Sequence, residues 1–272
     1  MRTYSTAAIL MTVLGLSACG DSGTTASGTT SSAGGAGGAG AGGAGGGGGG
    51  AIDACGDTDL AEEDLGTGSD PLAGVFSLDD ALAGLPEGDG PLRAHIETEL
   101  GAITCVLRPD VAPNGVANFV GLARGRRPFK DPVSKHWIKG RRFYDGLLFH
   151  RVIDDFVAQG GDPLGTGYGG PGYELDDEIG DLSHVPGTLA YANSGPNTNG
   201  SQFYVVAEKP ATFLDGSYVI FGRCSMGELA KVVDRAQPAS VVQAITEVPT
   251  DADDAPVDPI HMLHVGITRC AW

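Results

Sequence analysis

The chain has 272 residues, of which 45 are glycine and 41% are hydrophobic, and its formal net charge at pH 7 is −17. A surface this acidic repels nucleic-acid phosphates, so we expect no nucleic-acid partner. No run of about 20 apolar residues follows the N-terminal segment, which argues against an internal transmembrane helix.

The N-terminus has the features of an export signal with a lipidation site. A basic residue and an apolar run at positions 7–16 precede Leu16-Ser17-Ala18-Cys19, which resembles the bacterial lipobox. We expect a signal peptide at residues 1–18, a lipid anchor on Cys19 and a location in the cell envelope, at the outer membrane or the periplasmic face. Gly20 favours the outer membrane if the sorting rule of enteric bacteria applies. The alternative is an ordinary secretory signal with an unmodified cysteine.

Two segments of unusual composition follow. Every residue from Ala33 to Ala51 is glycine or alanine, so we interpret residues 19–51 as a flexible tether. Residues 52–91 form an acidic, turn-rich extension with one predicted helix at Leu78–Leu85. Ser77 is its expected N-cap and Asp80 completes a capping box. A helix this short needs the main domain to pack against.

Four cysteines remain after the lipobox. Disulfides persist in an oxidising compartment, so they are candidates for pairing. Four cysteines allow three complete pairings, and the sequence does not choose among them. Free buried thiols are the alternative. The four are Cys55, Cys105, Cys224 and Cys270.

The folded domain is predicted at residues 92–272. Apolar alternation predicts strands at 94–99, 102–107 and 262–267, and Asn199-Gly200 predicts a hairpin turn. Pro113 opens a helix with apolar residues at helical spacing, and a second helical pattern covers residues 227–233. Many short strands with two helices predict a mainly β fold, a closed antiparallel barrel capped at its ends.

Three sequence blocks are far more specific than these patterns. They are FHRVIDDFVAQGGDP at residues 149–163, GTLAYANSGPNTNGSQF at 187–203 and FLDGSYVIFG at 213–222. In this order and at these separations they resemble the cyclophilin family, and the resemblance extends over residues 92–272. It implies an eight-stranded antiparallel barrel with two capping helices that binds an X-Pro peptide on its surface.

The resemblance also implies roles for individual residues. Arg151 matches the catalytic arginine of the family. The residues that match the walls and floor of the proline pocket are Phe156, Val157, Tyr204 and Leu214. Those that match the positions holding the peptide backbone are Gln159, Ala192, Asn193 and Gln202. Phe213 and Tyr218 match the pocket rim.

Several positions depart from the family pattern or imitate other sites. Tyr204 stands where many relatives have Phe, which would place a hydroxyl near the pocket floor. Phe213 replaces the Trp that contacts cyclosporin in drug-sensitive relatives. Residues 126–142 resemble an insertion, either a partner-binding loop or a surface decoration. The G-x-G-x-x-G run at 165–170 is followed by Pro171-Gly172, which favours a loop over a dinucleotide site.

The sequence thus predicts a monomeric peptidyl-prolyl cis–trans isomerase that acts on proline-containing polypeptides. It would assist the folding of envelope proteins and contact the membrane through its lipid anchor alone. Stabilising a twisted amide with a fixed guanidinium requires no metal or cofactor. The alternative is a peptide-binding or chaperone module with incidental isomerase activity.

Overall fold

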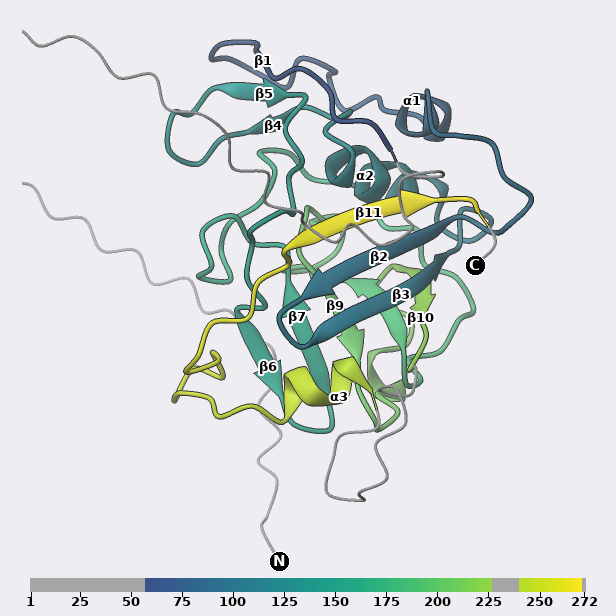
Figure 1. The fold of residues 1–272 in the computed structure, drawn as a ribbon, viewed down its shortest axis with the longest axis vertical. Coiled ribbons are helices and arrows are strands. Elements are labelled where there is room, and N and C mark those ends of the chain that lie inside the picture. Colours follow the sequence, from purple (N-terminus) through teal and green to yellow (C-terminus); the bar gives the residue numbers. More distant parts are fainter. Residues whose placement is uncertain (1–56, 227–239, 271–272) are drawn as a thin grey trace, which may run out of the picture. The chain divides into compact units, whose positions relative to one another are not determined.

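The computed structural model describes residues 57–226 and 240–270 (Figure 1). The predicted signal peptide, Cys19, the tether and the helical pattern at 227–233 lie outside the described residues. Among the residues that are described, no helix is both long and apolar enough to span a membrane.

The centre of the fold is an eight-stranded sheet in which all neighbours are antiparallel, in the order β11-β2-β3-β10-β8-β9-β7-β6. The two outer strands approach each other through the segments that precede them. Leu148 and His261 form an antiparallel bridge, and the Met262 N–H donates to the Leu147 carbonyl at 2.7 Å. The predicted eight-stranded barrel is therefore confirmed, with a seam held by a few hydrogen bonds rather than by a full ladder. The strands are β2 Arg93–Thr98, β3 Gly101–Leu107, β6 Arg151–Ile153, β7 Val157–Gly160, β8 Thr188–Tyr191, β9 Phe203–Val206, β10 Ile220–Cys224 and β11 His264–Thr268.

Alternation explains why β2 and β3 form where the sequence predicts them. Ala94 and Ile96 on β2, and Ile103 and Leu107 on β3, are buried in the barrel core, while the residues between them face outward. Gly101 starts β3 with φ +125°, a left-handed conformation that glycine adopts without a steric penalty. The strand pair is therefore positioned by its hydrophobic face and by the turn between its strands.

Helices lie at the two ends of the barrel (Figure 1). α2 (Pro113–Ala123) begins with proline, as predicted, and the Glu178 carboxylate accepts hydrogen bonds from the N–H groups of Asn114 and Gly115. α3 (Val241–Thr246) lies at the other end and is capped by the Ser240 hydroxyl, which accepts from the Gln243 N–H at 3.0 Å. A short 3₁₀ helix, η1 (Thr212–Leu214), precedes β10.

The predicted helix of the extension is present but shorter. α1 (Leu78–Leu82) has the expected capping box, in which the Ser77 hydroxyl accepts from the Asp80 N–H and the Asp80 carboxylate accepts from the Ser77 N–H. The helix ends three residues before Leu85, because Ala83 leaves helical geometry and Gly84 takes φ +69°. Its packing partner is α2 of the barrel domain.

The extension and the insertion form a second, smaller sheet. β1 (Glu63–Asp64), β5 (Trp137–Lys139) and β4 (Phe129–Lys130) are antiparallel, in the order β1-β5-β4. Trp137 is buried, its indole N–H donates to the Gly68 carbonyl at 3.0 Å, and its ring stacks on Tyr173. The insertion is therefore packed against this chain's own extension.

Opposite charges join the same two segments. Arg141 donates to Glu62 at 2.7 Å, Arg142 donates to Asp59 at 2.7 Å, and His136 lies 2.8 Å from Asp64. Each of these pairs has at least one partner that is substantially exposed, so each contributes little to stability. Together they pair three basic residues of the insertion with three acidic residues of the extension.

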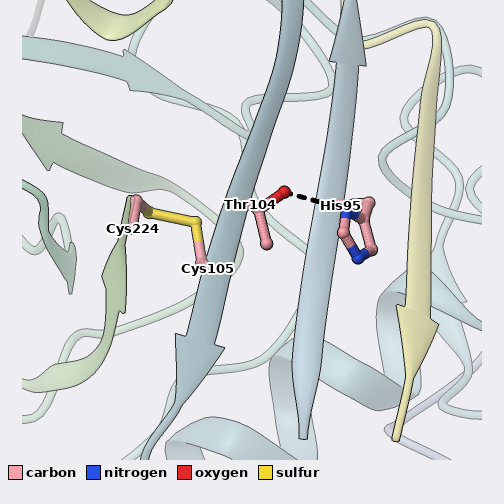
Figure 2. The surroundings of a disulfide bond; sticks show 4 residues. All are labelled: His95, Thr104, Cys105 and Cys224. Atoms are coloured by element: carbon pink, nitrogen blue, oxygen red, sulfur yellow. Dashed lines mark hydrogen bonds between the residues drawn. A yellow bond between two sulfur atoms is a disulfide. The ribbon is translucent and has the colours of Figure 1, made fainter. Parts of the chain in front are cut away.

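One disulfide fixes two neighbouring strands of the barrel. Cys105 of β3 and Cys224 of β10 lie directly opposite each other in the strand register and are bonded (Figure 2). On β3 the adjacent Thr104 contacts His95 of β2 instead, with 3.0 Å between Oγ1 and Nδ1. Cys270 is also disulfide-bonded. The alternative of free thiols is therefore wrong for these three cysteines.

The hairpin predicted at Asn199-Gly200 is present, because β8 and β9 are consecutive antiparallel neighbours, but a long loop joins them instead of a two-residue turn. This dipeptide lies within the long connection between β8 and β9, and Asn199 forms an isolated bridge with Leu175. The Asn199 amide donates to the Leu175 carbonyl at 3.2 Å and to Asp177 at 2.7 Å. Its side chain therefore organises a long loop.

Candidate functional site

One row of side chains crosses the outer face of the barrel. Arg151 of β6 lies opposite Gln159 of β7, Gln159 lies opposite Tyr204 of β9, and Tyr204 lies opposite Ala190 of β8. Side chains that face one another across antiparallel strands point to the same side of the sheet. The strands therefore place the predicted catalytic arginine beside the predicted peptide-binding residues.

The next residue along each strand points to the other side. Val152, Ala158, Val205 and Leu189 also lie opposite one another, and all four belong to the barrel core. The four strands therefore present one face to the core and the other to the site.

A second hydrophobic cluster covers this outer face, separate from the barrel core. Five of the predicted pocket residues, and Ala192 from the predicted backbone-holding positions, belong to it or pack against it. Val157 is the first residue of β7, and Phe156 directly precedes it. The full membership is Val157, Ala190, Tyr204, Val206, Ala211, Leu214 and Ile220, with Phe156, Leu182, Ala192 and Tyr218 packed against them. The structure thus brings the predicted proline-pocket residues together.

Aromatic rings form the boundary of this cluster. Phe213 is 74% exposed and lies nearly parallel to Phe156, with 5.7 Å between ring centroids. Tyr218 meets Tyr204 edge to face at 5.8 Å, and burial raises the pKa of both phenols. Phe213 is thus at the exposed margin of the cluster, as expected for a rim residue.

The Tyr204 hydroxyl is engaged beneath the cluster. It lies 2.9 Å from Nε2 of the fully buried His184, whose Nδ1 lies 2.7 Å from an Asp215 carboxylate oxygen. Hydrogen bonds from the Ser183 hydroxyl and from the His184 backbone and ring lower the pKa of Asp215 to about 2. An ionised Asp215 accepts from Nδ1–H, which leaves Nε2 to accept from the Tyr204 hydroxyl. The Tyr204 hydroxyl therefore has its hydrogen-bond partner within this chain.

Hydrogen bonds link two glutamine side chains of the site to a neighbouring loop. Gln159 donates to the Gln202 side-chain oxygen at 3.0 Å, and Gln202 in turn donates to the carbonyls of Gly167 and Gly169, each at 2.9 Å. These carbonyls belong to the glycine-rich segment, which contains no helix, as predicted. Asp162 shapes the loop by accepting from the Leu164 and Thr166 N–H groups. The glutamines are therefore held in place by a loop that folds back onto the sheet.

Ala192 and Asn193 follow directly after β8. The Ala192 N–H donates to the Gln202 carbonyl at 3.0 Å, and the Asn193 amide donates to the Ser217 carbonyl at 3.2 Å. Both residues are partly exposed. They connect the glutamine side of the site to the segment that carries Tyr218.

Arg151 itself is partly buried, with 31% of its side chain exposed. One guanidinium nitrogen, Nη2, lies 3.2 Å from the Asp254 carboxylate. His150, its neighbour in sequence, is buried, and desolvation lowers the pKa of its ring. The permanent cation at this site is therefore Arg151.

Comparison with known proteins identifies the family of this chain. The family described as cyclophilin type peptidyl-prolyl cis-trans isomerase/CLD matches residues 93–267. The chain belongs to the cyclophilin family. It is therefore an enzyme, a peptidyl-prolyl cis–trans isomerase.

Individual cyclophilins support the assignment. Peptidyl-prolyl cis-trans isomerase A of Mycobacterium tuberculosis is 43% identical over 177 residues, which are 64% of this chain and 91% of that protein. The isomerase B of Streptomyces anulatus is 43% identical over 172 residues, covering 62% of this chain and 92% of that protein. A crystal structure of a cyclophilin type isomerase of Cryptosporidium parvum is similar with a TM-score of 0.51 and 30% identity, covering 64% of this chain and 96% of that one.

Sequence reasoning did not identify three polar residues that contact the site. His184 and Asp215 support Tyr204, and Asp254 contacts Arg151. The substitution of tyrosine in a cyclophilin pocket was a usable signal, because a buried hydroxyl needs a hydrogen-bond partner. No comparable signal marks Asp254, which lies far along the chain in an acidic loop.

Proposed function

We propose that this cyclophilin isomerises X-Pro bonds at the face defined by Arg151 and assists the folding of proline-containing polypeptides in the bacterial cell envelope. The observation that carries the proposal is the position of the Arg151 guanidinium, in one row with Gln159 and Tyr204 and beside an apolar cluster on the same face. A related cyclophilin structure, from Cryptosporidium parvum, was determined in the presence of the dipeptide Ala-Pro. That relative supports a proline peptide as the ligand class.

The chemistry follows from the electronic structure of the amide. Conjugation gives the X-Pro bond a rotation barrier of about 18–20 kcal/mol. At the midpoint of rotation the prolyl nitrogen loses conjugation and regains a basic lone pair. A guanidinium N–H that donates to this lone pair stabilises the twisted state and offers little to the planar one, which is differential binding of the transition state.

Each part of the site contributes one element to this mechanism. Arg151 supplies a guanidinium, which presents its N–H donors in a rigid plane. The apolar cluster around Phe156 and Leu214 would bind the proline ring while the acyl side rotates. Gln159 and Asn193 would hydrogen-bond the peptide backbone. No covalent intermediate is needed.

The envelope role is supported by the export signal and by the disulfide. Cys19 lies in the lipobox-like sequence. The bond between Cys105 and Cys224 suits an oxidising compartment, where disulfides form and persist. Uncatalysed X-Pro isomerisation takes tens to hundreds of seconds, so envelope proteins with native cis-prolines would fold faster with an isomerase tethered nearby.

The test is turnover of an X-Pro peptide in a protease-coupled assay. Arg151→Ala should lower kcat/KM by about 100-fold or more, the scale expected for losing a donor to a developing charge. Its stability should change little, because the side chain is partly exposed. Arg108→Ala is a matched control, since Arg108 is an exposed arginine that pairs with Asp110 outside the site. A folded Arg151→Ala variant with wild-type turnover would contradict the mechanism.

The same variant distinguishes the isomerase function from the alternative, a peptide-binding or chaperone module. If the protein acts chiefly as a peptide-binding or chaperone module, Arg151→Ala should suppress aggregation of an unfolded client as well as wild type does. If isomerisation is the function, Arg151→Ala should fail to accelerate refolding of a client whose slow step is prolyl isomerisation.

A further inference from the structure

The acidic loop that precedes β11 reaches the site and contacts Arg151. Asp254 lies in this loop, between α3 and β11, and its carboxylate is 3.2 Å from Nη2 of Arg151. The Arg151 side chain is 31% exposed and that of Asp254 44% exposed. A pair this accessible to water adds little to folding stability. Its main effect is therefore expected on the Arg151 side chain itself.

The loop holds the Asp254 carboxylate in a defined place. The Val152 N–H, on β6, donates to the Asp254 carbonyl at 2.8 Å. Within the loop, the Asp251 carboxylate accepts from the N–H groups of Asp253 and Ala255. Asp254 itself has φ +63°, a left-handed conformation that aspartate tolerates better than most residues. The backbone of Asp254 is thus fixed to the strand that carries Arg151, one residue away from it.

An arginine side chain has several rotatable bonds, and a partly exposed one samples many rotamers unless something restrains it. Its guanidinium carries five N–H donors in one plane, so a carboxylate that binds one edge leaves donors on the other edges for a substrate. Ordering a long side chain before the reaction removes an entropic cost from the reaction itself.

We infer that Asp254 is a positioning residue that holds the Arg151 guanidinium in its reactive orientation. The inference rests on the proposed role of Arg151. Asp254 acts through that side chain and makes no contact with the substrate. Its effect should therefore appear in turnover, and the ground-state affinity for the peptide should be preserved.

The experiment is a double-mutant cycle with two readouts, kcat/KM for an X-Pro peptide and the Kd of the same peptide. Asp254→Ala should lower kcat/KM by about three- to tenfold, the range expected from freeing one long side chain, and should leave Kd within about twofold. Asp254→Asn keeps an oxygen acceptor at the same reach and should recover part of the loss. Asp253→Ala, on the same loop and with an exposed side chain, is the matched control and should behave as wild type.

The decisive comparison is made in an Arg151→Ala background, with enzyme concentration raised to keep turnover measurable. There, Asp254→Ala should cause no further loss. An equal loss of activity in both backgrounds would mean that Asp254 only stabilises the loop. A gain of activity from Asp254→Ala in the wild-type background would mean that Asp254 inhibits Arg151. Either result overturns the inference. If Arg151→Ala alone kept full activity, the proposed function would fail instead, so the two failures are distinguishable.

Ionic strength gives a second, independent measurement. Salt screens an exposed ion pair, and the Debye length falls from about 10 Å at 0.1 M to about 3 Å at 1 M. With an uncharged peptide, wild-type kcat/KM should decline toward the value of Asp254→Ala as salt rises, while the variant itself stays flat. Parallel salt curves for the two proteins would contradict the inference.

Discussion

Removing the Asp57 carboxylate should destabilise the protein far more than removing the nearby Asp59 carboxylate. Asp57 binds Arg124 through two contacts, Nε to Oδ2 at 2.7 Å and Nη2 to Oδ1 at 2.6 Å. The Arg124 side chain is 0% exposed and that of Asp57 2% exposed, whereas that of Asp59 is 85% exposed. Arg124 also donates to the Ala81 and Ala83 carbonyls of the extension. Asp57→Ala would leave a buried guanidinium without its counter-charge.

The size of the effect follows from that burial. Breaking a buried ion pair by deleting one partner costs about 3–5 kcal/mol, whereas an exposed pair is worth about 0–1 kcal/mol. With a urea m value of about 2–3 kcal/mol per M, Asp57→Ala should lower the unfolding midpoint by about 1–2.5 M. Asp59→Ala should lower it by less than about 0.5 M.

The assay is urea unfolding followed both by tryptophan fluorescence and by far-UV circular dichroism. Trp137 is buried in the sheet that the extension forms with the insertion, so fluorescence of a Trp272→Phe background, which removes the second tryptophan of the chain, reports on that region. The two probes should coincide in wild type if the extension and the barrel unfold together. Turnover at low urea should be unchanged, because Asp57 is not in the site. Equal midpoints for Asp57→Ala and Asp59→Ala would refute the reasoning.

Three further outcomes are expected. Cyclosporin should inhibit Phe213→Trp at least about tenfold more tightly than wild type, because an indole N–H can donate to a drug carbonyl that a phenyl ring leaves unpaired. Equal inhibition of the two proteins would mean that another position determines drug sensitivity. The Asp145 hydrogen bond raises the pKa of His264, so the charged ring stabilises the fold below its ordinary pKa and that stabilisation is lost as pH rises through the raised value. The difference in unfolding free energy between wild type and Asp145→Asn should therefore shrink from pH 6 to pH 8, and a constant difference would contradict this. Cys19→Ala should lose acylation and either accumulate unprocessed or appear in the soluble fraction, and mass spectrometry that shows an unmodified mature Cys19 in the wild-type protein would overturn this expectation.

Local pattern predicted the elements whose geometry is local. Alternation located β2, β3 and β11, and a proline followed by helical spacing located α2. The residues of the candidate site could be named from the sequence because they lie within or directly beside three long sequence blocks. The structure places Arg151, Val157, Gln159 and Tyr204 on one face of adjacent strands and the other candidates in the segments between strands.

Contacts between distant segments could not be predicted from the same patterns. The bond between Cys105 and Cys224 depends on the register of β3 against β10, two strands that are 119 residues apart at this point. The pairing of β1 with β5 depends on only two residues of each strand, too few for alternation to show. Opposite charge in the extension and the insertion was visible, but charge alone does not specify which residues meet. Asp254 reaches Arg151 through a loop whose shape comes from internal hydrogen bonds.

The two-sided use of β6, β7, β9 and β8 has a consequence for how such a chain can change over time. Val157 and Ala158 are neighbours in sequence, yet one belongs to the outer cluster and the other to the barrel core. Inserting or deleting a single residue in these strands would exchange the two faces, directing Arg151 toward the core and core valines toward the peptide. Changes in length are therefore expected only where the strands have ended, as in residues 126–142 between α2 and β6, which resemble an insertion. Side chains in the row that contains Arg151 and in the core can be substituted, but the number of residues in these strands cannot change.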